Sequence, residues 1–374
     1  MTVCRVPVLV LLGLLVVATS AVRAEVLIGL SVPLTGPVAW GGAGQQVGAE
    51  TAVEDLNAKG GVLGQRIELI AADDFCDRDQ GLAAARKLVE AGVVAVFGLI
   101  CSDVAIPAAR VYAEAGVLMI SSGASNPKLT EQGFQTVFRL FGRDDVQGSM
   151  GGDLLADRFG AKPIAILHDG RVFGQGIAQE AKKRLNQRGV AEAMFEAIQF
   201  GQVDYSDVIR KMQAAGIEVL YYGGLRHEAG LILRQAHDRG YNLQLVSGDG
   251  IAGEDFALIA GPAGNGTMMT HAPIPMADPD AARLAERFAA KDFAGLPGPF
   301  RAYATVQVWA RAVERAGTVA PSAVAETLKA AQFDTVLGRI GFDPKGDVTG
   351  ANTFVWYVWQ GGKLVPFKEA AAKD

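Results

Sequence analysis

The feature that most constrains this chain is a regular alternation of short apolar runs with amphipathic segments that end in glycine. From Val26 onward, VLIGLSVPL is followed by GAETAVEDLNAKGG, IELIAADD by RDQGLAAARKLVEAG, and VVAVFGLI by DVAIPAARVYAEAG. Continuous apolar strands separated by such helices are typical of parallel, doubly wound sheets, because helices then cover both faces of each strand. We therefore predict an α/β fold.

A second series of the same kind begins at residues 146–160 with VQGSMGGDLLADRFG and continues through PIAILHD, EVLYYGG and QLVSGDG. Two series predict two doubly wound parallel-sheet lobes, and 374 residues suit two domains of ~100 to 200 residues each. After about Thr270 the pattern changes to three helical segments without strands between them. Two alternating segments, ANTFVWYVW and GKLVPF, follow and are separated by the turn QGG.

The first residues, 1–24, differ from the rest of the chain. An uncharged apolar run extends from Val6 to Val22 between Arg5 and Arg23, and it contributes to the high mean hydropathy of +0.21. A run of ~17 residues is short for a membrane span, and Val22-Arg23-Ala24 suits signal peptidase. We predict an exported, freely soluble protein whose signal peptide is cleaved after Ala24; a retained membrane anchor is the alternative.

Charge and motif content exclude several classes of function. Without residues 1–24 the chain holds 33 Lys and Arg against 40 Asp and Glu, a net charge of -7, which argues against nucleic acid as a partner. GDGIAG at 248–253 fits a dinucleotide fingerprint, but no acid stands ~20 residues further on to hold a ribose. We expect no cofactor, no metal and no catalysis, since no serine elbow is present and the histidines lack metal-ligand spacing. The four histidines are His168, His227, His237 and His271.

Two cysteines, Cys76 and Cys101, remain after the leader is removed. Each follows an apolar run, IELIAADDF or VVAVFGLI, so both are expected just past the carboxyl ends of strands on the same rim of a sheet. Two cysteines in an oxidising compartment favour a disulfide, and closing a loop of 25 residues would contribute ~3 to 4 kcal/mol. Two buried thiols are the alternative.

Polar residues gather where the expected strands end, which is where ligands bind in open α/β sheets. In the first series these are Cys101-Ser102-Asp103 and Ser121-Ser122-Gly123-Ala124-Ser125, near helix starts whose free N–H groups favour an anion. In the second series Asp249 stands between two glycines and suits a cation. Helix capping by the serines and a turn at Asp249 are the alternative interpretations. An anion site on one lobe and a cation site on the other predict a zwitterion, such as an amino acid, in a shared cleft.

A set of motifs in a fixed order resembles the leucine/isoleucine/valine-binding proteins of bacterial ABC importers, within the type I periplasmic binding proteins. The resemblance covers essentially all of residues 25–374. Its pieces are PLTGPVA at 33–39, AVEDLNAKGGVLG at 52–64, DDFCD at 73–77, the Cys101-Ser102 pair, NPKLT at 126–130, HDGRVFGQG at 168–176, YYGG at 221–224, ILRQA at 232–236 and DPKGDVTG at 343–350.

The resemblance implies two lobes joined by three hinge strands that close around the ligand. The matching motifs place the chain crossings near Gly142, His271 and Gly350. Lobe one would then comprise 25–143 plus 275–348, and lobe two 144–274 plus 349–374.

The resemblance also implies roles for individual residues. Ser102 matches the serine that holds the ligand carboxylate, Gly123 and Ser125 match positions that bind the same group, and Ala124 between them is expected to contact the ligand as well. Asp249 falls where the family has an acid, usually Glu, that pairs with the ammonium group. Cys76 and Cys101 match the family disulfide.

The sequence departs from the family at aromatic positions of the side-chain pocket. Phe173 and Leu225 stand where tyrosines are common, and Gly41, after Trp40, occupies a place that is commonly aromatic. We therefore expect a more apolar pocket, suited first to leucine, isoleucine and valine and next to phenylalanine or a larger apolar amino acid.

The predicted function is that of a monomeric periplasmic solute-binding protein that delivers an apolar amino acid to a membrane ABC permease. The alternative is a binding protein or sensor for aromatic carboxylates or amides.

Overall fold

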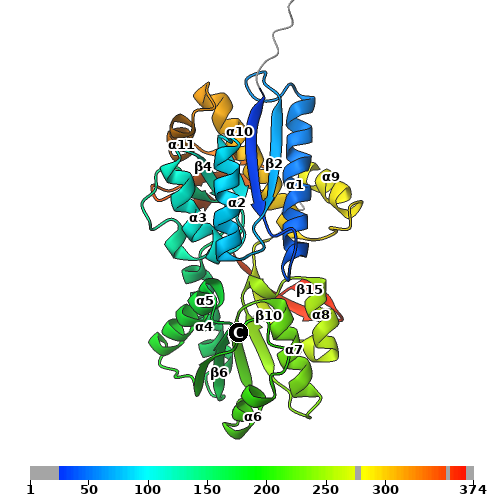
Figure 1. Ribbon diagram of the computed structural model, residues 1–374. Coiled ribbons are helices and arrows are strands. Elements are labelled where there is room, and N and C mark those ends of the chain that lie inside the picture. Colours follow the sequence, from blue (N-terminus) through cyan, green and yellow to red (C-terminus); the bar gives the residue numbers. More distant parts are fainter. Residues whose placement is uncertain (1–24, 274–278, 351–353, 368–374) are drawn as a thin grey trace, which may run out of the picture.

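The computed structural model describes residues 25–273, 279–350 and 354–367. The chain forms two main sheets, each between layers of helices, and the two layered units lie one above the other in Figure 1. The predicted leader, residues 1–24, lies outside the described residues. In the described part of the chain, no helix combines the length and the apolar character needed to cross a membrane.

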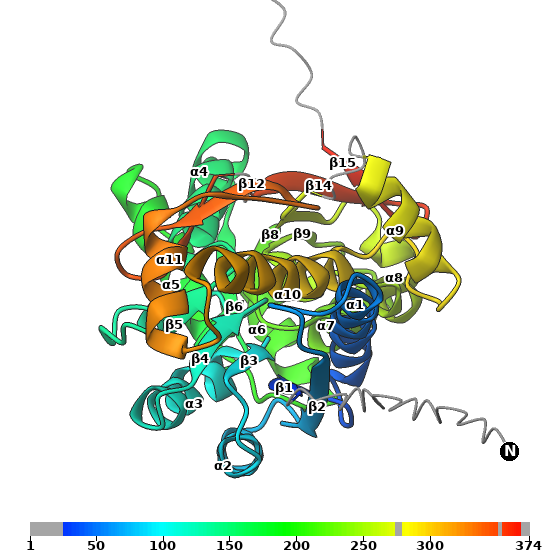
Figure 2. The ribbon, with the colours of Figure 1, turned by 90° about the horizontal axis from the view of Figure 1, so that it is seen from above.

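The first sheet has five strands, all parallel, in the spatial order β2-β1-β3-β4-β5. They are β2 (Ile67–Asp73), β1 (Val26–Val32), β3 (Ala95–Gly98), β4 (Leu118–Ser121) and β5 (Val137–Arg139). One face packs against α1 (Ala39–Ala58), α10 (Pro297–Ala316) and α11 (Pro321–Ala330), as Figure 2 shows from above. The other face packs against α2 (Arg78–Glu90) and α3 (Ser102–Glu114). Because both faces are covered, the strands are apolar along almost their whole length.

The second sheet has seven strands in the order β15-β14-β10-β9-β8-β6-β7. They are β15 (Lys363–Pro366), β14 (Val355–Gln360), β10 (Met268–His271), β9 (Gln244–Ser247), β8 (Val219–Gly223), β6 (Ile164–His168) and β7 (Met194–Ala197). The last two strands in sequence, β14 and β15, are antiparallel and join as a hairpin, so this sheet is not wholly parallel.

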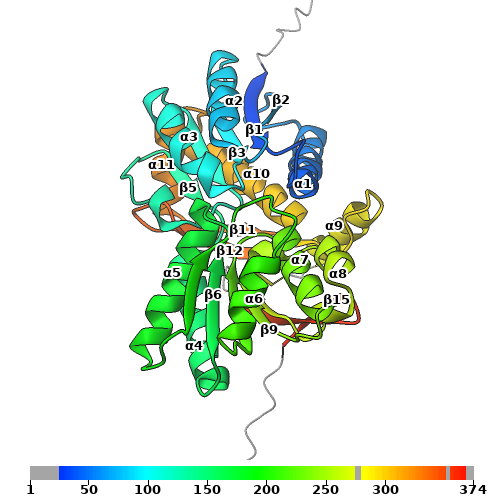
Figure 3. The same cartoon turned by 60° about the horizontal axis from the view of Figure 1, so that its bottom comes forward.

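Helices cover both faces of the second sheet as well. One face packs against α4 (Asp144–Phe159) and α5 (Val172–Gln187), and the other against α6 (Ser206–Ala214), α7 (Arg226–His237) and α8 (Glu254–Ala260). Figure 3 shows β6 between α5 and α6. The described residues also form three 3-10 turns, which are η1 (Pro127–Leu129), η2 (Asp249–Ile251) and η3 (Gly261–Gly264). The prediction of an α/β fold with two doubly wound lobes is confirmed.

The three late helices return to the first sheet. Leu284 and Phe288 of α9 (Pro279–Ala289), Trp309 of α10 and Val324 of α11 belong to the same apolar core as β1 and β3. A small antiparallel sheet of β11 (Phe333–Thr335), β12 (Gly338–Phe342) and β13 (Val348–Gly350) follows them.

A buried ion pair ties this small sheet to the first main sheet. The Nε atom of Arg139, at the end of β5, lies 2.9 Å from Oδ1 of Asp347, which precedes β13. The strandless helical run therefore completes the first layered unit after the chain has built the second.

The parallel strands of the two sheets have the same order, which determines where a ligand can bind. In the first sheet β1 has β2 on one side and β3 on the other, and in the second sheet β6 has β7 on one side and β8 on the other. At such a point the connections leave to opposite sides, so the loops part and leave a crevice at the carboxyl ends of the strands. The two crevices face each other.

Candidate ligand-binding site

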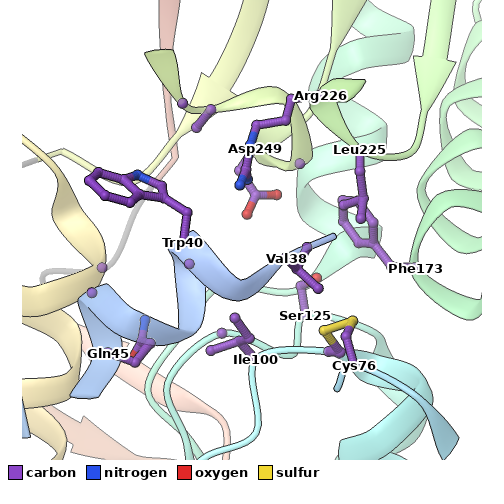
Figure 4. Close-up of a pocket in the computed structure, with 18 of the residues that line it drawn as sticks. Val38, Trp40, Gln45, Cys76, Ile100, Ser125, Phe173, Leu225, Arg226 and Asp249 are labelled. Atoms are coloured by element: carbon purple, nitrogen blue, oxygen red, sulfur yellow. A yellow bond between two sulfur atoms is a disulfide. The ribbon is translucent and has the colours of Figure 1, made fainter. Parts of the chain in front are cut away.

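One pocket lies between the two sheets, and its walls are the segments that follow strands of both. Figure 4 shows Asp249 and Arg226 on one side of it and Ser125, Ile100 and the Cys76 disulfide on the other. Eight of the nine residues predicted to contact a ligand line this pocket: Trp40, Gly41, Ser102, Gly123, Ser125, Phe173, Leu225 and Asp249. The ninth, Ala124, does not line it. Ala124 is fully buried, and it packs against the core formed by α2, α3 and β4.

Ser102 lies at the start of α3, directly after β3 and the disulfide. It is the first helical residue, and Cys101 is the N-cap. Its hydroxyl oxygen accepts a 3.3 Å hydrogen bond from the backbone N–H of Asn126. Its own proton has no acceptor among the described residues, so it is available to an anion. Because α3 also directs the positive end of its dipole toward the pocket, this corner favours a carboxylate.

Gly123 and Ser125 follow β4 and lie beside Ser102 on the pocket wall. The backbone N–H groups of Gly123 and Ala124 both donate to the side-chain oxygen of Ser121, at 3.3 and 3.0 Å. The N–H of Gly123, which was predicted to bind the ligand, is thus already engaged by a long bond. The hydroxyls of Ser102 and Ser125, the other groups predicted to bind the ligand carboxylate, border the pocket at the same corner.

The hydroxyl of Ser125 also lies near a buried carboxyl group, that of Asp144 at the start of α4. Burial raises the pKa of Asp144 to about 8, and the nearby Ser125 hydroxyl partly offsets this effect. The Asp144 side chain is fully buried, although neither of its oxygens has a well-formed hydrogen bond. A carboxyl group in this environment favours the protonated, neutral form at pH 7.

Asp249 faces the anion corner from the second sheet, as the first residue of η2 after β9. Its neighbours are glycines because other side chains approach closely: a Cβ atom on Gly248 would lie 2.5 Å from Oε1 of Gln147, and one on Gly250 would lie 2.6 Å from the Phe173 ring. Burial raises the pKa of Asp249 to about 6, against the opposing effects of the Arg301 charge and of Gln147. The carboxylate is therefore ionised at pH 7, and its Oδ1 is buried without a described hydrogen-bond donor.

Apolar and aromatic residues form the rest of the wall. Trp40 is 43% exposed and stacks on Phe293, which precedes α10, with ring centres 4.5 Å apart. Gly41 leaves room beside Ile100, whose Cδ1 would lie 3.5 Å from an added Cβ. Phe173 in the first turn of α5 and Leu225 at the N-cap of α7 lie across from them. These side chains can enclose an apolar group.

Sequence reasoning missed Arg301, which lies in the pocket wall on α10. It is 8% exposed, and its Nε donates to the backbone carbonyl of Ser122 at 3.2 Å. Burial lowers its pKa to about 10, and the nearby Asp249 charge opposes that decrease. No spacing or motif marked this residue. The available signal was an arginine within an otherwise apolar helical stretch, PGPFRAYATV, where a solvent-exposed face is absent.

Arg171, just before α5, was also missed. Its Nη2 donates to the backbone carbonyl of Cys76 at 2.6 Å and lies 3.5 Å from Oδ2 of Asp103. The next backbone N–H, that of Val172, donates to Oδ1 of Asp103 at 3.3 Å. The side-chain amide of Asn126 donates to the Val172 carbonyl at 3.2 Å. These contacts join the second layered unit directly to the first at the edge of the pocket.

The predicted disulfide between Cys76 and Cys101 is present, with the two Cα atoms 5.5 Å apart. Both cysteines border the pocket next to Ser102. His271 also lines the pocket, and burial lowers its pKa to about 3, so its ring is neutral. The described residues contain no group of three or more potential metal ligands.

This fold and pocket are those of a two-lobed ligand-binding protein. The sequence matches the family model described as periplasmic binding protein over residues 25–363, and the chain belongs to that family. It is 44% identical over 340 residues to a Leu/Ile/Val-binding protein homolog of Brucella suis, an alignment that covers 91% of each chain. It is 40% identical to a leucine-, isoleucine-, valine-, threonine- and alanine-binding protein of Pseudomonas aeruginosa, with 89% of each chain covered.

Among solved structures, a leucine-binding protein of Thermotoga maritima has a TM-score of 0.83 at 25% identity. The match covers 92% of this chain and 98% of that one. The predicted resemblance to the leucine/isoleucine/valine-binding proteins is confirmed.

Proposed function

We propose that this protein captures an apolar amino acid in the periplasm, branched-chain amino acids first, and delivers it to a membrane ABC permease. The relatives named above bind, by their names, leucine, isoleucine and valine, and they support this ligand class. No chemical step is assigned to the site. We propose that the protein acts as a monomer and that it is exported after cleavage following Ala24.

One observation carries the proposal: the pocket has opposite chemistry on its two walls. The hydroxyls of Ser102 and Ser125 lie at the α3 corner, which favours an anion, and the ionised Asp249 comes from the other sheet. An α-amino acid presents a carboxylate and an ammonium group on one carbon, so it can bind both walls at once. The side chain would then lie among Trp40, Phe173 and Leu225.

A ligand without an ammonium group fits this pocket less well. An aromatic carboxylate would leave the Asp249 carboxylate buried without the cation that an amino acid supplies. Such an uncompensated charge is costly, because desolvation is no longer repaid by an opposite charge. This is the reason to place the amino acid before the aromatic carboxylates and amides.

The test is isothermal titration of the chain 25–374, unfolded and refolded to remove carried-over ligand. The ligands are leucine, isoleucine, valine, phenylalanine and benzoate. We expect one-to-one binding of the branched-chain amino acids and none of benzoate. In Asp249→Ala the loss of a buried charge pair of ~3 kcal/mol weakens leucine binding about a hundredfold.

The matched control is Asp153→Ala. Asp153 pairs with Arg184 and Arg188 on the outer side of the second unit and does not line the pocket. Its removal leaves leucine affinity unchanged. Unaltered leucine affinity in Asp249→Ala would refute the ammonium site, and binding of benzoate alone would refute the amino-acid assignment.

A further inference from the structure

Arg301 is held rigidly in the wall of the pocket. Its Nε donates to the Ser122 carbonyl at 3.2 Å, and its guanidinium carbon lies 4.5 Å above the centre of the Phe141 ring. The side chain comes from the second turn of α10, where it is 8% exposed. These contacts fix the plane of the guanidinium group, so its remaining N–H groups point in set directions.

One of those N–H groups has no partner. The Nη1 atom of Arg301 is shielded from solvent and donates to none of the described residues. Asp249 is close enough to influence the charge of Arg301, yet no ion pair joins them among the described side chains. His271, which also lines the pocket near Arg301, is neutral and uses Nδ1 in a 2.8 Å contact with the Ala272 carbonyl.

The other two arginines that line the pocket are already paired, whereas Oδ2 of Asp169, which also lines it, is buried without a described partner. Arg171 lies against Asp103, and Arg226 against Asp255. When the ligand ammonium binds Asp249, it takes the carboxylate whose charge acts on Arg301. A hydrocarbon side chain in the same cavity would offer the already shielded Nη1 no acceptor. Buried donors without acceptors weaken binding, whereas an oxygen atom at this point would satisfy the donor.

We propose that Arg301 is a specificity-determining residue whose Nη1 donates to an oxygen on the ligand side chain. The pocket thus gains affinity for amino acids with an uncharged amide or hydroxyl oxygen, relative to hydrocarbon side chains of the same shape. An uncharged acceptor satisfies the donor without adding a second negative charge beside Asp249. The inference rests on the proposed function, since it assumes an amino acid bound through Ser102 and Asp249.

The experiment uses ligands of nearly equal shape: leucine with asparagine, and valine with threonine. Each is titrated into the wild-type chain 25–374 and into Arg301→Met, which keeps an unbranched side chain but has no donor. We expect the affinity for asparagine to fall about tenfold more than that for leucine, and likewise for threonine relative to valine. Equal losses for both members of each pair would overturn the proposal.

Arg226→Met is the matched control. Arg226 lines the same pocket, but its Nε is paired with Asp255. Its replacement should change the affinities for leucine and asparagine by the same factor. If the ratio of leucine to asparagine affinity shifts as much in Arg226→Met as in Arg301→Met, the effect is a general one of pocket charge, and the proposal is overturned.

Leucine binding by Arg301→Met reports that the variant folds. If the variant does not fold, titration of the wild type still tests the proposal. We then expect the Kd values for asparagine and threonine to lie within a factor of ten of those for leucine and valine. If asparagine and threonine both bind more than a hundredfold more weakly than leucine and valine, the role of Arg301 is refuted. If aspartate binds more tightly than asparagine, the choice of an uncharged acceptor is refuted. A wild type that binds no amino acid at all refutes the proposed function itself.

Discussion

Asp249 shows how a single carboxylate is prepared for a cation. Gly248 and Gly250 leave room for Gln147 and Phe173 beside it, and its Oδ1 is buried. This burial raises its pKa to about 6, while the charge of Arg301 keeps the ionised form accessible at neutral pH. The group is therefore charged without a bound partner. Folding has already removed water from the carboxylate, so an ammonium ion that binds there gains the full attraction of the opposite charge.

The raised pKa of Asp249 predicts a pH dependence of binding. The ammonium group pairs only with the ionised carboxylate, so affinity is full above about pH 6 and is lost as the pH falls through that value. We expect the Kd for leucine to rise about tenfold per pH unit below pH 6. Titrations between pH 4.5 and 8 would measure it.

Asp249→Asn is the control for this profile, because it keeps the shape of the side chain but cannot ionise. Asp169 also lines the pocket, and burial raises its pKa to about 6 as well. A slope below pH 6 that persists in Asp249→Asn would assign the pH dependence to Asp169, whereas a slope near pH 8 would assign it to Asp144 beside Ser125. A flat profile in the wild type would contradict the role given to Asp249.

Residues that follow strands could be predicted from the sequence, whereas residues brought in from elsewhere could not. Ser102, Ser125 and Asp249 each follow an apolar run within a few residues, and parallel strands bring such ends to one edge. Arg301 reaches the pocket from a helix that returns to the first sheet late in the chain. Its position depends on tertiary packing, for which local periodicity carries no signal.

At the scale of elements, the disulfide determines how α3 begins. It joins Cys76, after β2, to Cys101, the N-cap of α3. Phe75 and Cys76 adopt φ values of 54° and 56°, a region that residues with a side chain seldom occupy. Oδ1 of Asp74 accepts from the Cys76 N–H at 2.9 Å and supports this turn. The bond thus holds the start of α3, and with it Ser102, in a fixed place on the pocket wall.

Removal of the disulfide is expected to lower stability. The bond closes a loop of 25 residues, for which the entropy of the unfolded chain accounts for ~3 kcal/mol. The double variant Cys76→Ser/Cys101→Ser should therefore lose about that much free energy of unfolding, measured by denaturant titration of the ligand-free protein. The reduced wild-type protein should have the same free energy of unfolding as the variant. Equal denaturation midpoints for the oxidised wild type and the variant would contradict this expectation.

At the scale of the whole molecule, three chain crossings were predicted near Gly142, His271 and Gly350. A small apolar cluster lies close to these three positions and consists of Phe141, Ala272 and Phe354. The ring centres of Phe141 and Phe354 are 5.5 Å apart. This cluster supports the proposal that 25–143 plus 275–348 and 144–274 plus 349–374 are the two moving lobes. The hairpin of β14 and β15, which pairs with β10, supports the assignment of the C-terminal segment to the second lobe.

Closure of such lobes depends on contacts that exist only in the closed form. We propose that Arg171 makes such contacts, because it binds the Cys76 carbonyl and lies beside Asp103 on the opposite unit. Arg171→Met removes these contacts without touching the groups assigned to the ligand. We expect about tenfold weaker leucine binding, because the charged side chains are partly exposed and their contacts are only moderately strong.

The loss in Arg171→Met should appear mainly in the dissociation rate, since the contacts form after the ligand has entered. Stopped-flow release of leucine would measure it, with Arg184→Met, on the outer surface of the second unit, as the control. A closing contact acts alike on every ligand, so the ratio of leucine to asparagine affinity stays as in the wild type. A shifted ratio would mean that Arg171 reads the side chain, and unchanged release would mean that closure is stabilised elsewhere.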